Sequence, residues 1–290
     1  MKFLRMAARA IAATVAVPAI AGLLAVQRVV GSLTGNYRTI PSIIYGTLRK
    51  LFSYKVEFNA ASAPLVKDKP VWYVANHLSG ADAFVVGGTL DGSFLGRDDA
   101  MKWPVLRQAF RAIRMIGVRR KPEFNDQVRG AIAKNFNAGY NTIMFPEGAT
   151  SDGKKVFLFH AAFLTLLYGG SAVDKKKKPV TLQKDVVVQP VAIRVKSVNG
   201  KDALNNDELR NLYTLPGRNT LRRIWKRAQT KRITLELTVL PALDPKDFKD
   251  AKELANHAAQ DIAGVVNPGQ KDFEKAHIPG YTPGKKPVAA

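Results

Sequence analysis

A histidine and an aspartate five positions apart, His77 and Asp82, could perform acid–base chemistry. A neutral histidine can take a proton from a hydroxyl, and a carboxylate on its other ring nitrogen would fix the tautomer and stabilise the imidazolium that forms. A spacing of five does not stack two side chains on one helix face. The pair can therefore meet only if His77 lies in the turn before a helix and Asp82 in that helix's first turn.

The segment before this pair predicts where it lies. Residues 71–75 mix β-branched and aromatic side chains directly after Pro70, which is typical of a short buried strand. His77 would then lie at the carboxyl end of a strand, where open α/β sheets usually bind ligands. However, Ser79 and Asp82 also fit a helix capping box in its Asp form, with His77 as a bystander. This motif by itself leaves both interpretations open.

A second polar motif follows another apolar run. Residues 145–151, Phe-Pro-Glu-Gly-Ala-Thr-Ser, come directly after the run 142–144. Gly148 permits close approach of the backbone to a ligand, and Glu147, the hydroxyl of Ser151 and main-chain N–H groups could hold a polar headgroup. The alternative is a Pro-Gly turn that carries a surface carboxylate.

Together and in this order, the two motifs resemble those of the 1-acylglycerol-3-phosphate acyltransferase family, which carries Asn-His-x-Ser-x-x-Asp early and Phe-Pro-Glu-Gly-Thr later. The resemblance implies transfer of a fatty acyl group from acyl-CoA or acyl carrier protein to the hydroxyl of a lysophospholipid, with 1-acylglycerol-3-phosphate favoured. His77 would deprotonate that hydroxyl and Asp82 would orient His77. Glu147, Gly148 and Ser151 would contact the acceptor. Neither a metal nor a cofactor is expected.

A third segment resembles the block of the family that ends in a phosphate-binding arginine. In residues 115–120 this role falls to Arg120, with Arg119 as the alternative. A guanidinium is permanently charged and can grip phosphate with two parallel hydrogen bonds. The competing interpretation is a solvated basic cluster at a strand end.

Some positions depart from the family's pattern. Ala149 stands where Thr is common, Thr150 where Arg is often found, and His160, in a stretch that we predict to be helical, where the family has Lys. These changes leave the His77–Asp82 pair intact but alter the headgroup contacts. They leave room for another acceptor, such as lyso-ornithine lipid.

Charge and composition bound the class of protein. The 290 residues include 45 Lys and Arg against 23 Asp and Glu, a net charge of +22, which predicts a polyanionic partner. The candidates are an anionic membrane surface, a nucleic acid and acidic substrates. We expect no nucleic acid, because a basic surface explains neither motif. The chain has no cysteine and four histidines, which offer no metal-ligand spacing. No Gly-x-Ser-x-Gly elbow supports a serine hydrolase.

The order of segments predicts three regions. Residues 1–54 contain two apolar stretches with basic flanks, so we expect helices embedded in or lying on the cytoplasmic membrane, with the active site facing the cytoplasm. A cleaved signal peptide is the alternative. Residues 55–245 alternate strands and helices, which predicts an α/β domain with a largely parallel or mixed sheet flanked by helices. Residues 246–290 should form a helix and a poorly ordered tail after Val266.

Two helices and one strand are predicted in more detail. Residues 103–113 are expected to form an amphipathic helix, and residues 216–232 a basic interfacial helix with Trp225 as its aromatic anchor. Residues 186–193 read as a strand. Pro190 within that strand argues for a sheet edge or a bulge, because proline cannot donate to the ladder.

Overall fold

The structure, a computed structural model, describes residues 2–98, 107, 110, 111, 113–119, 121–214, 225–227 and 229–276. Most of the predicted helices 103–113 and 216–232 lies outside these residues, as does Arg120. The helices are α1 (Lys2–Thr34), α2 (Thr39–Leu51), α3 (Asp82–Gly87), α5 (Asn125–Asn137), α6 (Asp207–Thr214) and α8 (Ala251–Val266). The strands are β1 (Tyr54–Phe58), β2 (Val71–Ala75), β3 (Ser93–Arg97), β4 (Ile116–Val118), β5 (Thr142–Met144), β6 (Val187–Val198), β7 (Lys201–Asp202) and β8 (Ile233–Val239). Short 3-10 helices occupy Pro122–Phe124, Leu164–Tyr168 and Pro245–Asp247.

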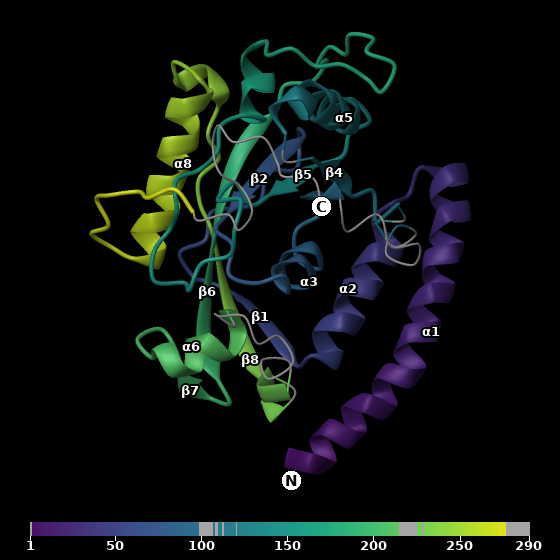
Figure 1. Ribbon diagram of the computed structural model, residues 1–290, viewed down its shortest axis with the longest axis vertical. Helices are drawn as coiled ribbons and strands as arrows, with labels where there is room; N and C mark the ends of the chain where they lie inside the picture. Colours follow the sequence, from purple (N-terminus) through teal and green to yellow (C-terminus); the bar gives the residue numbers. More distant parts are fainter. Residues whose placement is uncertain are drawn as a thin grey trace, which may run out of the picture.

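The strands described form one mixed sheet in the order β1-β8-β6-β2-β5-β3-β4, with β7 paired to β6 (Figure 1). All pairs are parallel except β6 with β8 and β6 with β7. The predicted α/β class with a largely parallel or mixed sheet is therefore confirmed. Since β2 and β5 run parallel, with Val74 opposite Met144, the segments that follow them emerge side by side at one edge.

Side chains of β2 alternate between two cores, which makes the domain three layers. Trp72 and Val74 pack with α5 and α8 on one face of the sheet. Val71, Tyr73 and Ala75 pack with α2, α3 and α6 on the other. All five residues of β2 are buried, as expected of a parallel strand that is covered on both faces.

Pro190 lies within a central strand and away from its one irregularity, so neither the predicted sheet edge nor the predicted bulge is found at this proline. β6 pairs with β2 on one side and β8 on the other, and its one register irregularity lies at Val195 and Ser197. The β8 ladder ends at Val191, and the amide of Gln189 donates to the carbonyl of Leu240 over 3.2 Å. That side-chain amide satisfies an acceptor at the point where proline has no N–H to offer.

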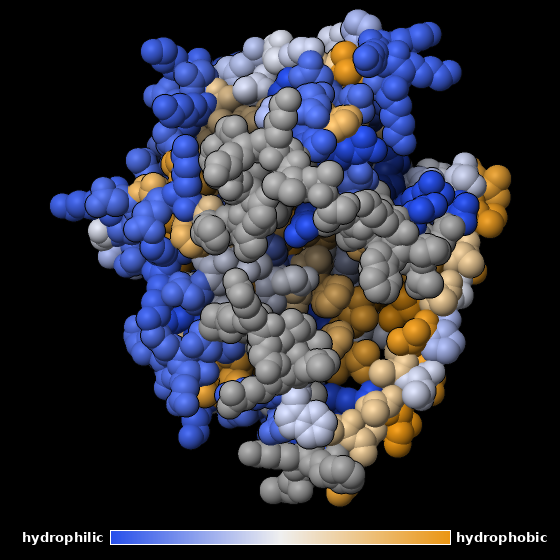
Figure 2. Space-filling view, in the orientation of Figure 1, coloured by the Kyte–Doolittle hydropathy of each residue, from blue (hydrophilic) through white to orange (hydrophobic). Residues whose placement is uncertain are grey.

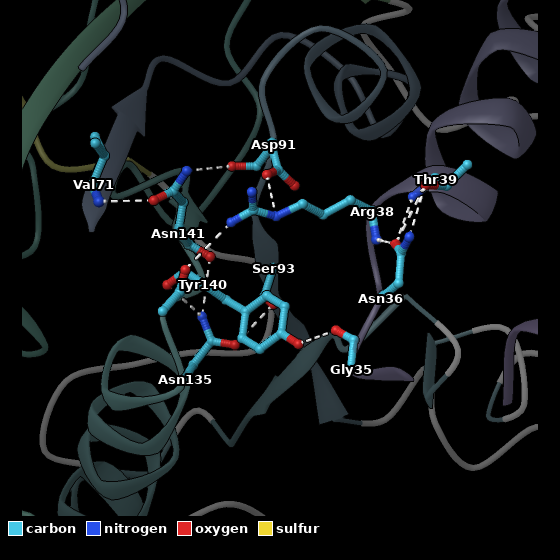
Figure 3. Close-up of polar contacts among 11 residues, drawn as sticks. Gly35, Asn36, Arg38, Thr39, Val71, Asp91, Ser93, Asn135, Tyr140 and Asn141 are labelled. Atoms are coloured by element: carbon cyan, nitrogen blue, oxygen red, sulfur yellow. Dashed lines mark hydrogen bonds and ion pairs between the residues drawn. The ribbon is translucent and has the colours of Figure 1, made fainter. Parts of the chain in front are cut away.

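The α1–α2 pair is fixed to the domain at both ends. Near the start of α1, Arg9 donates to the hydroxyl of Ser53 and to the carbonyl of Thr230, both over 2.7 Å. Just past its end, the carbonyl of Gly35 accepts from the hydroxyl of Tyr140 (Figure 3). In the same turn, Arg38 pairs with Asp91 over 2.7 Å.

This second attachment is built at the amino ends of β2, β3 and β5 (Figure 3). Asn141 accepts from the N–H of Val71 over 2.9 Å and donates to the carbonyl of Asp91 over 3.0 Å. Ser93 donates to Asn135 over 3.0 Å, and Asn135 in turn donates to the carbonyl of Asn141. The turn between α1 and α2 is thus held at the edge of the sheet opposite His77.

α1 carries an apolar stripe that nothing in the described chain covers. Its residues 4–34 are long and apolar enough to cross a membrane by length and composition, and 6% of that stretch is buried. Figure 2 shows apolar residues along this helix and around the hollow beside it. Its large exposed apolar side chains are Leu4, Ile11, Val15, Val17, Val26, Val29 and Leu33. Except for Val17, their spacing places them on one side of a helix.

The C-terminal segment packs more closely than its composition suggested. α8 contributes seven buried residues to one core face, so it belongs to the same packed unit as the sheet. Beyond it, in the part expected to be poorly ordered, Gln270 exchanges two hydrogen bonds with the backbone of Val156 and Phe273 packs on the core. The backbone carbonyl of Glu274 accepts from Leu158 over 2.8 Å. Residues 267–276 therefore form an ordered strap along residues 155–158.

Candidate active site

His77 and Asp82 meet in the way that their spacing required. His77 lies in the turn after β2, and Asp82 is the first residue of α3. Nδ1 of His77 lies 2.8 Å from Oδ2 of Asp82. The side chain of His77 is 21% exposed, whereas that of Asp82 is fully buried. The contact engages Nδ1, so Nε2 is the ring nitrogen free to meet a substrate from outside.

Asp82 is held by donors on both of its oxygens. Oδ2 also accepts from the backbone N–H groups of Leu78 and Ser79, over 2.7 and 3.0 Å. The bond from Ser79 is one half of the capping box that the sequence offered as an alternative. The other half is absent, because the hydroxyl of Ser79 accepts from Ala81 and not from Asp82. One carboxylate therefore both caps the turn and binds the imidazole.

A tyrosine that the sequence did not single out donates to the other oxygen of Asp82. The hydroxyl of Tyr213 in α6 donates to Oδ1 of Asp82 over 2.6 Å. Burial, and then the charge of Asp82, raise the pKa of this phenol well above its usual value, so it remains a donor. Tyr213 follows Asp82 by 131 positions, and no local spacing pattern could have revealed the contact.

Arg227 links this tyrosine to the turn that carries His77. Its guanidinium donates to the carbonyl of Tyr213 and, over 3.2 Å, to the hydroxyl of Ser79. It also lies 5.3 Å from the ring centre of Tyr213 and 5.6 Å from that of Tyr54. Arg227, which belongs to the predicted basic interfacial helix, therefore contacts the turn that carries His77. Trp225, from the same predicted helix, is exposed.

Asn76 fixes the start of the turn through its side chain. Its amide donates to the carbonyl of Ile193 over 3.0 Å and accepts from the N–H of Ile193 over 2.7 Å. These two bonds continue the pairing of β2 with β6 one step past Ala75, where the main chain turns away. His77 is therefore held immediately after a rigid strand end.

The second motif lies against the first, as the parallel strands require. The ring of Phe145 stacks on that of His77, with centres 4.4 Å apart and planes 15° apart. The N–H of Ser151 donates to the carbonyl of His77 over 2.7 Å. Gly148 has a φ of 73°, a left-handed conformation that favours glycine, and its N–H closes the turn onto Phe145.

Glu147 is fully buried and does not lie on the surface of its turn. This rules out the surface carboxylate offered as the alternative. Burial is the main cause that raises the pKa of Glu147 well above its usual value. The backbone N–H groups of His77 and Phe157 act in the opposite direction, and Asp82 adds to the rise. The carboxyl group therefore lies behind the turn that carries His77, and its contact with a lipid headgroup stays a prediction.

The remaining predicted positions fall away from this centre or outside the described chain. Arg120 lies outside the described residues. Arg119 donates to Asp98 over 2.8 Å and covers the ring of Phe124 at the surface. His160, predicted to be helical, lies in an irregular segment, where its N–H donates to the carbonyl of Pro146 over 2.9 Å.

A comparison with known protein families agrees with this arrangement of the two motifs. Residues 56–194 match the family model described as Acyltransferase. The chain carries an acyltransferase-family domain. This domain contains both motifs and the strands that present them, so the family resemblance predicted from the motifs is confirmed.

Two curated relatives of this acyltransferase domain have different names. The lyso-ornithine lipid O-acyltransferase of Brucella abortus is 28% identical over 57% of the chain and 59% of its own length. The 1-acyl-sn-glycerol-3-phosphate acyltransferase of Neisseria gonorrhoeae is 25% identical over 68% of the chain and 69% of its own length. The chain thus matches less than two thirds of the Brucella protein.

A solved structure shares the fold. It is the 1-acyl-sn-glycerophosphate acyltransferase of Thermotoga maritima, with a TM-score of 0.56 and 19% identity. The likeness covers 93% of this chain and 98% of that one, so it extends past the acyltransferase domain to the flanking segments.

Proposed function

We propose that this protein transfers a fatty acyl group from an acyl thioester, carried by CoA or acyl carrier protein, to the hydroxyl of a lysophospholipid. The observation that carries the proposal is the His77–Asp82 contact of 2.8 Å, at the sheet edge where the Phe145–Gly148 turn also lies. The family match supports the reaction class.

The geometry supports a single acid–base route. Nε2 of His77 takes the proton of the acceptor hydroxyl while that oxygen attacks the thioester carbonyl. As the carbon–sulfur bond breaks, the proton passes from the imidazolium to the leaving thiolate. Asp82 stabilises the imidazolium between these steps and holds Nδ1 as the donor. Proton abstraction of this kind supplies ~10²–10⁴ in rate, and positioning of the two substrates must supply much of the rest. The route needs neither a metal nor a cofactor.

The headgroup site belongs to the same proposal. We assign Gly148 and Ser151 to the wall of this site and Arg120 to the acceptor phosphate. For Glu147, burial behind His77 favours support of the catalytic turn over direct contact with lipid.

The membrane assignment rests on the attachments of α1. A helix that crossed the bilayer would carry its two ends to opposite sides. Here both ends contact the same domain, through the bond of Arg9 to Thr230 near one end and through the bond of Gly35 to Tyr140 just past the other. The exposed apolar stripe from Leu4 to Leu33, ~44 Å long at 1.5 Å per residue, supports a helix lying flat in one leaflet. We propose the cytoplasmic leaflet, with the active site facing the cytoplasm.

The net charge of +22 fits the same picture. Basic side chains near an anionic bilayer are worth about 1 kcal/mol each, so a few of them suffice to hold a domain at the membrane. A nucleic-acid-binding protein would use the same charge but would have no use for a histidine held by a buried aspartate.

A second acceptor has specific support. The Brucella relative is named for lyso-ornithine lipid, and Ala149, Thr150 and His160 depart from the pattern of phosphate-acceptor enzymes. An ornithine headgroup is an amine and a carboxylate, and does not need two cationic contacts for a phosphate. 1-Acylglycerol-3-phosphate remains the favoured acceptor, and lyso-ornithine lipid is the second candidate.

The test is acyl transfer by membranes from cells that express the protein, with labelled acyl-CoA or acyl carrier protein and a panel of lyso-acceptors. Membranes with the His77→Ala variant at the same level provide the blank. Product from one acceptor class with wild type only would support the assignment and name the acceptor. Equal product from both membranes would refute it.

A further inference from the structure

Tyr213 is placed to tune the His77–Asp82 pair from the side opposite the imidazole. Its hydroxyl is 2.6 Å from Oδ1 of Asp82, while His77 engages Oδ2. Both Tyr213 and Asp82 are fully buried, so no solvent competes for the contact. A hydrogen bond to a charged acceptor in such surroundings is stronger than one between neutral groups.

Apart from Tyr213, the hydrogen-bond donors that the described chain offers to Asp82 all bind the same oxygen, Oδ2. Oδ2 has the imidazole and the N–H groups of Leu78 and Ser79. Oδ1 accepts from the hydroxyl of Tyr213, which lies in a helix beyond the acyltransferase family match, which ends at residue 194. α6 therefore reaches back into the catalytic centre from outside the matched domain.

We infer that Tyr213 is a positioning residue that sets the basicity of His77 through Asp82. The inference rests on the proposed role of His77 as the base. Donation from the phenol spreads the negative charge of the carboxylate away from Oδ2. Without it, more charge remains at Oδ2, the imidazolium is stabilised, and His77 keeps its proton to higher pH.

The structure supplies a matched control in Tyr54. Its hydroxyl is also buried but has no hydrogen-bond partner among the described residues, and its ring lies 5.5 Å from that of Tyr213. Tyr54→Phe thus removes a buried hydroxyl from the same aromatic pair without touching Asp82. Tyr213→Phe removes the hydroxyl that does contact Asp82.

The experiment compares both variants with wild type in two measurements. The first is the pH dependence of kcat/KM for acyl transfer. The second is titration of His77 by NMR on protein labelled at its four histidines, with the His77 signal assigned from His77→Gln. For Tyr213→Phe we expect the acidic limb of the kcat/KM profile and the midpoint of the His77 titration to move together to higher pH, by about one unit. We also expect kcat to be about 10-fold lower and KM to be unchanged. Tyr54→Phe should follow wild type.

Several results would overturn the inference. One is a Tyr213→Phe enzyme whose pH profile and His77 titration coincide with those of wild type. Another is a Tyr54→Phe enzyme in which both curves shift as much as in Tyr213→Phe. If Tyr213→Phe does not fold, a ring-fluorinated tyrosine at the same position keeps the hydroxyl and makes it a stronger donor. It should move both curves to lower pH, and no movement would again refute the role. An active His77→Gln enzyme would instead refute the proposed base, whatever the tyrosine variants do.

Discussion

Oδ2 of Asp82 accepts from Nδ1 of His77 over 2.8 Å and from the backbone N–H of Leu78 over 2.7 Å. The carboxylate that orients the ring therefore also shapes the turn in which the ring lies. A change at Asp82 should affect both the chemistry and the local structure.

Replacing Asp82 with Asn tests this double role. The amide keeps the shape but carries no charge to stabilise an imidazolium, so we expect acyl transfer to fall by ~10²–10⁴. Loss of a buried charged acceptor should also lower the free energy of unfolding by about 1–3 kcal/mol. The measurements are kcat and thermal unfolding. Asp185→Asn, at an exposed carboxylate, is the control. Retained activity in Asp82→Asn would contradict the role of the carboxylate.

Glu147 should make stability depend on pH. Because its pKa is raised well above 4.5, the folded chain keeps a proton that the unfolded chain releases. Stability should therefore fall as pH rises from about 4.5 toward the raised value, by about 1.4 kcal/mol for each unit crossed. Glu147→Gln cannot titrate, so relative to wild type it should gain stability as pH rises. Denaturant unfolding at pH 5 and pH 8 measures the difference, and parallel behaviour of the two proteins would count against a buried titrating carboxyl group.

The orientation of α1 can be measured by depth. The chain has no cysteine, so single cysteines at Ile11, Val15 and Val29 can be labelled with an environment-sensitive probe. A flat helix predicts that all three lie at the same shallow depth in anionic vesicles, as reported by collisional quenchers. A cysteine at Lys178, in an exposed loop, is the control that stays in water. A probe at Val15 much deeper than at the other two would indicate a crossing helix.

The sequence was sufficient to predict local features of the fold and site. The run 71–75 became β2, and the spacing of His77 and Asp82 required the turn-to-helix geometry that is observed. Strand periodicity and motif order also identified the α/β class and the neighbouring Phe145–Gly148 turn, since parallel strands bring their carboxyl ends together.

What the sequence could not predict depends on contacts between distant segments. Tyr213 reaches Asp82 across 131 positions, and Arg227 reaches Ser79 across 148. Glu147 was expected to help to hold a headgroup, and its full burial next to the backbone N–H groups of His77 and Phe157 could not be foreseen from its turn sequence. Pro190 was expected at an edge or a bulge, because a local rule on proline cannot foresee that the side chain of Gln189 donates to the carbonyl of Leu240.

The most direct test of the account is the initial rate of acyl transfer by purified His77→Gln, with the acceptor that wild type uses. His257→Gln, at an exposed histidine on α8, is the matched control. We predict that His77→Gln loses at least 10²-fold in rate and still binds vesicles, while His257→Gln keeps the wild-type rate. A His77→Gln enzyme with the wild-type rate would contradict the assignment of His77 as the base.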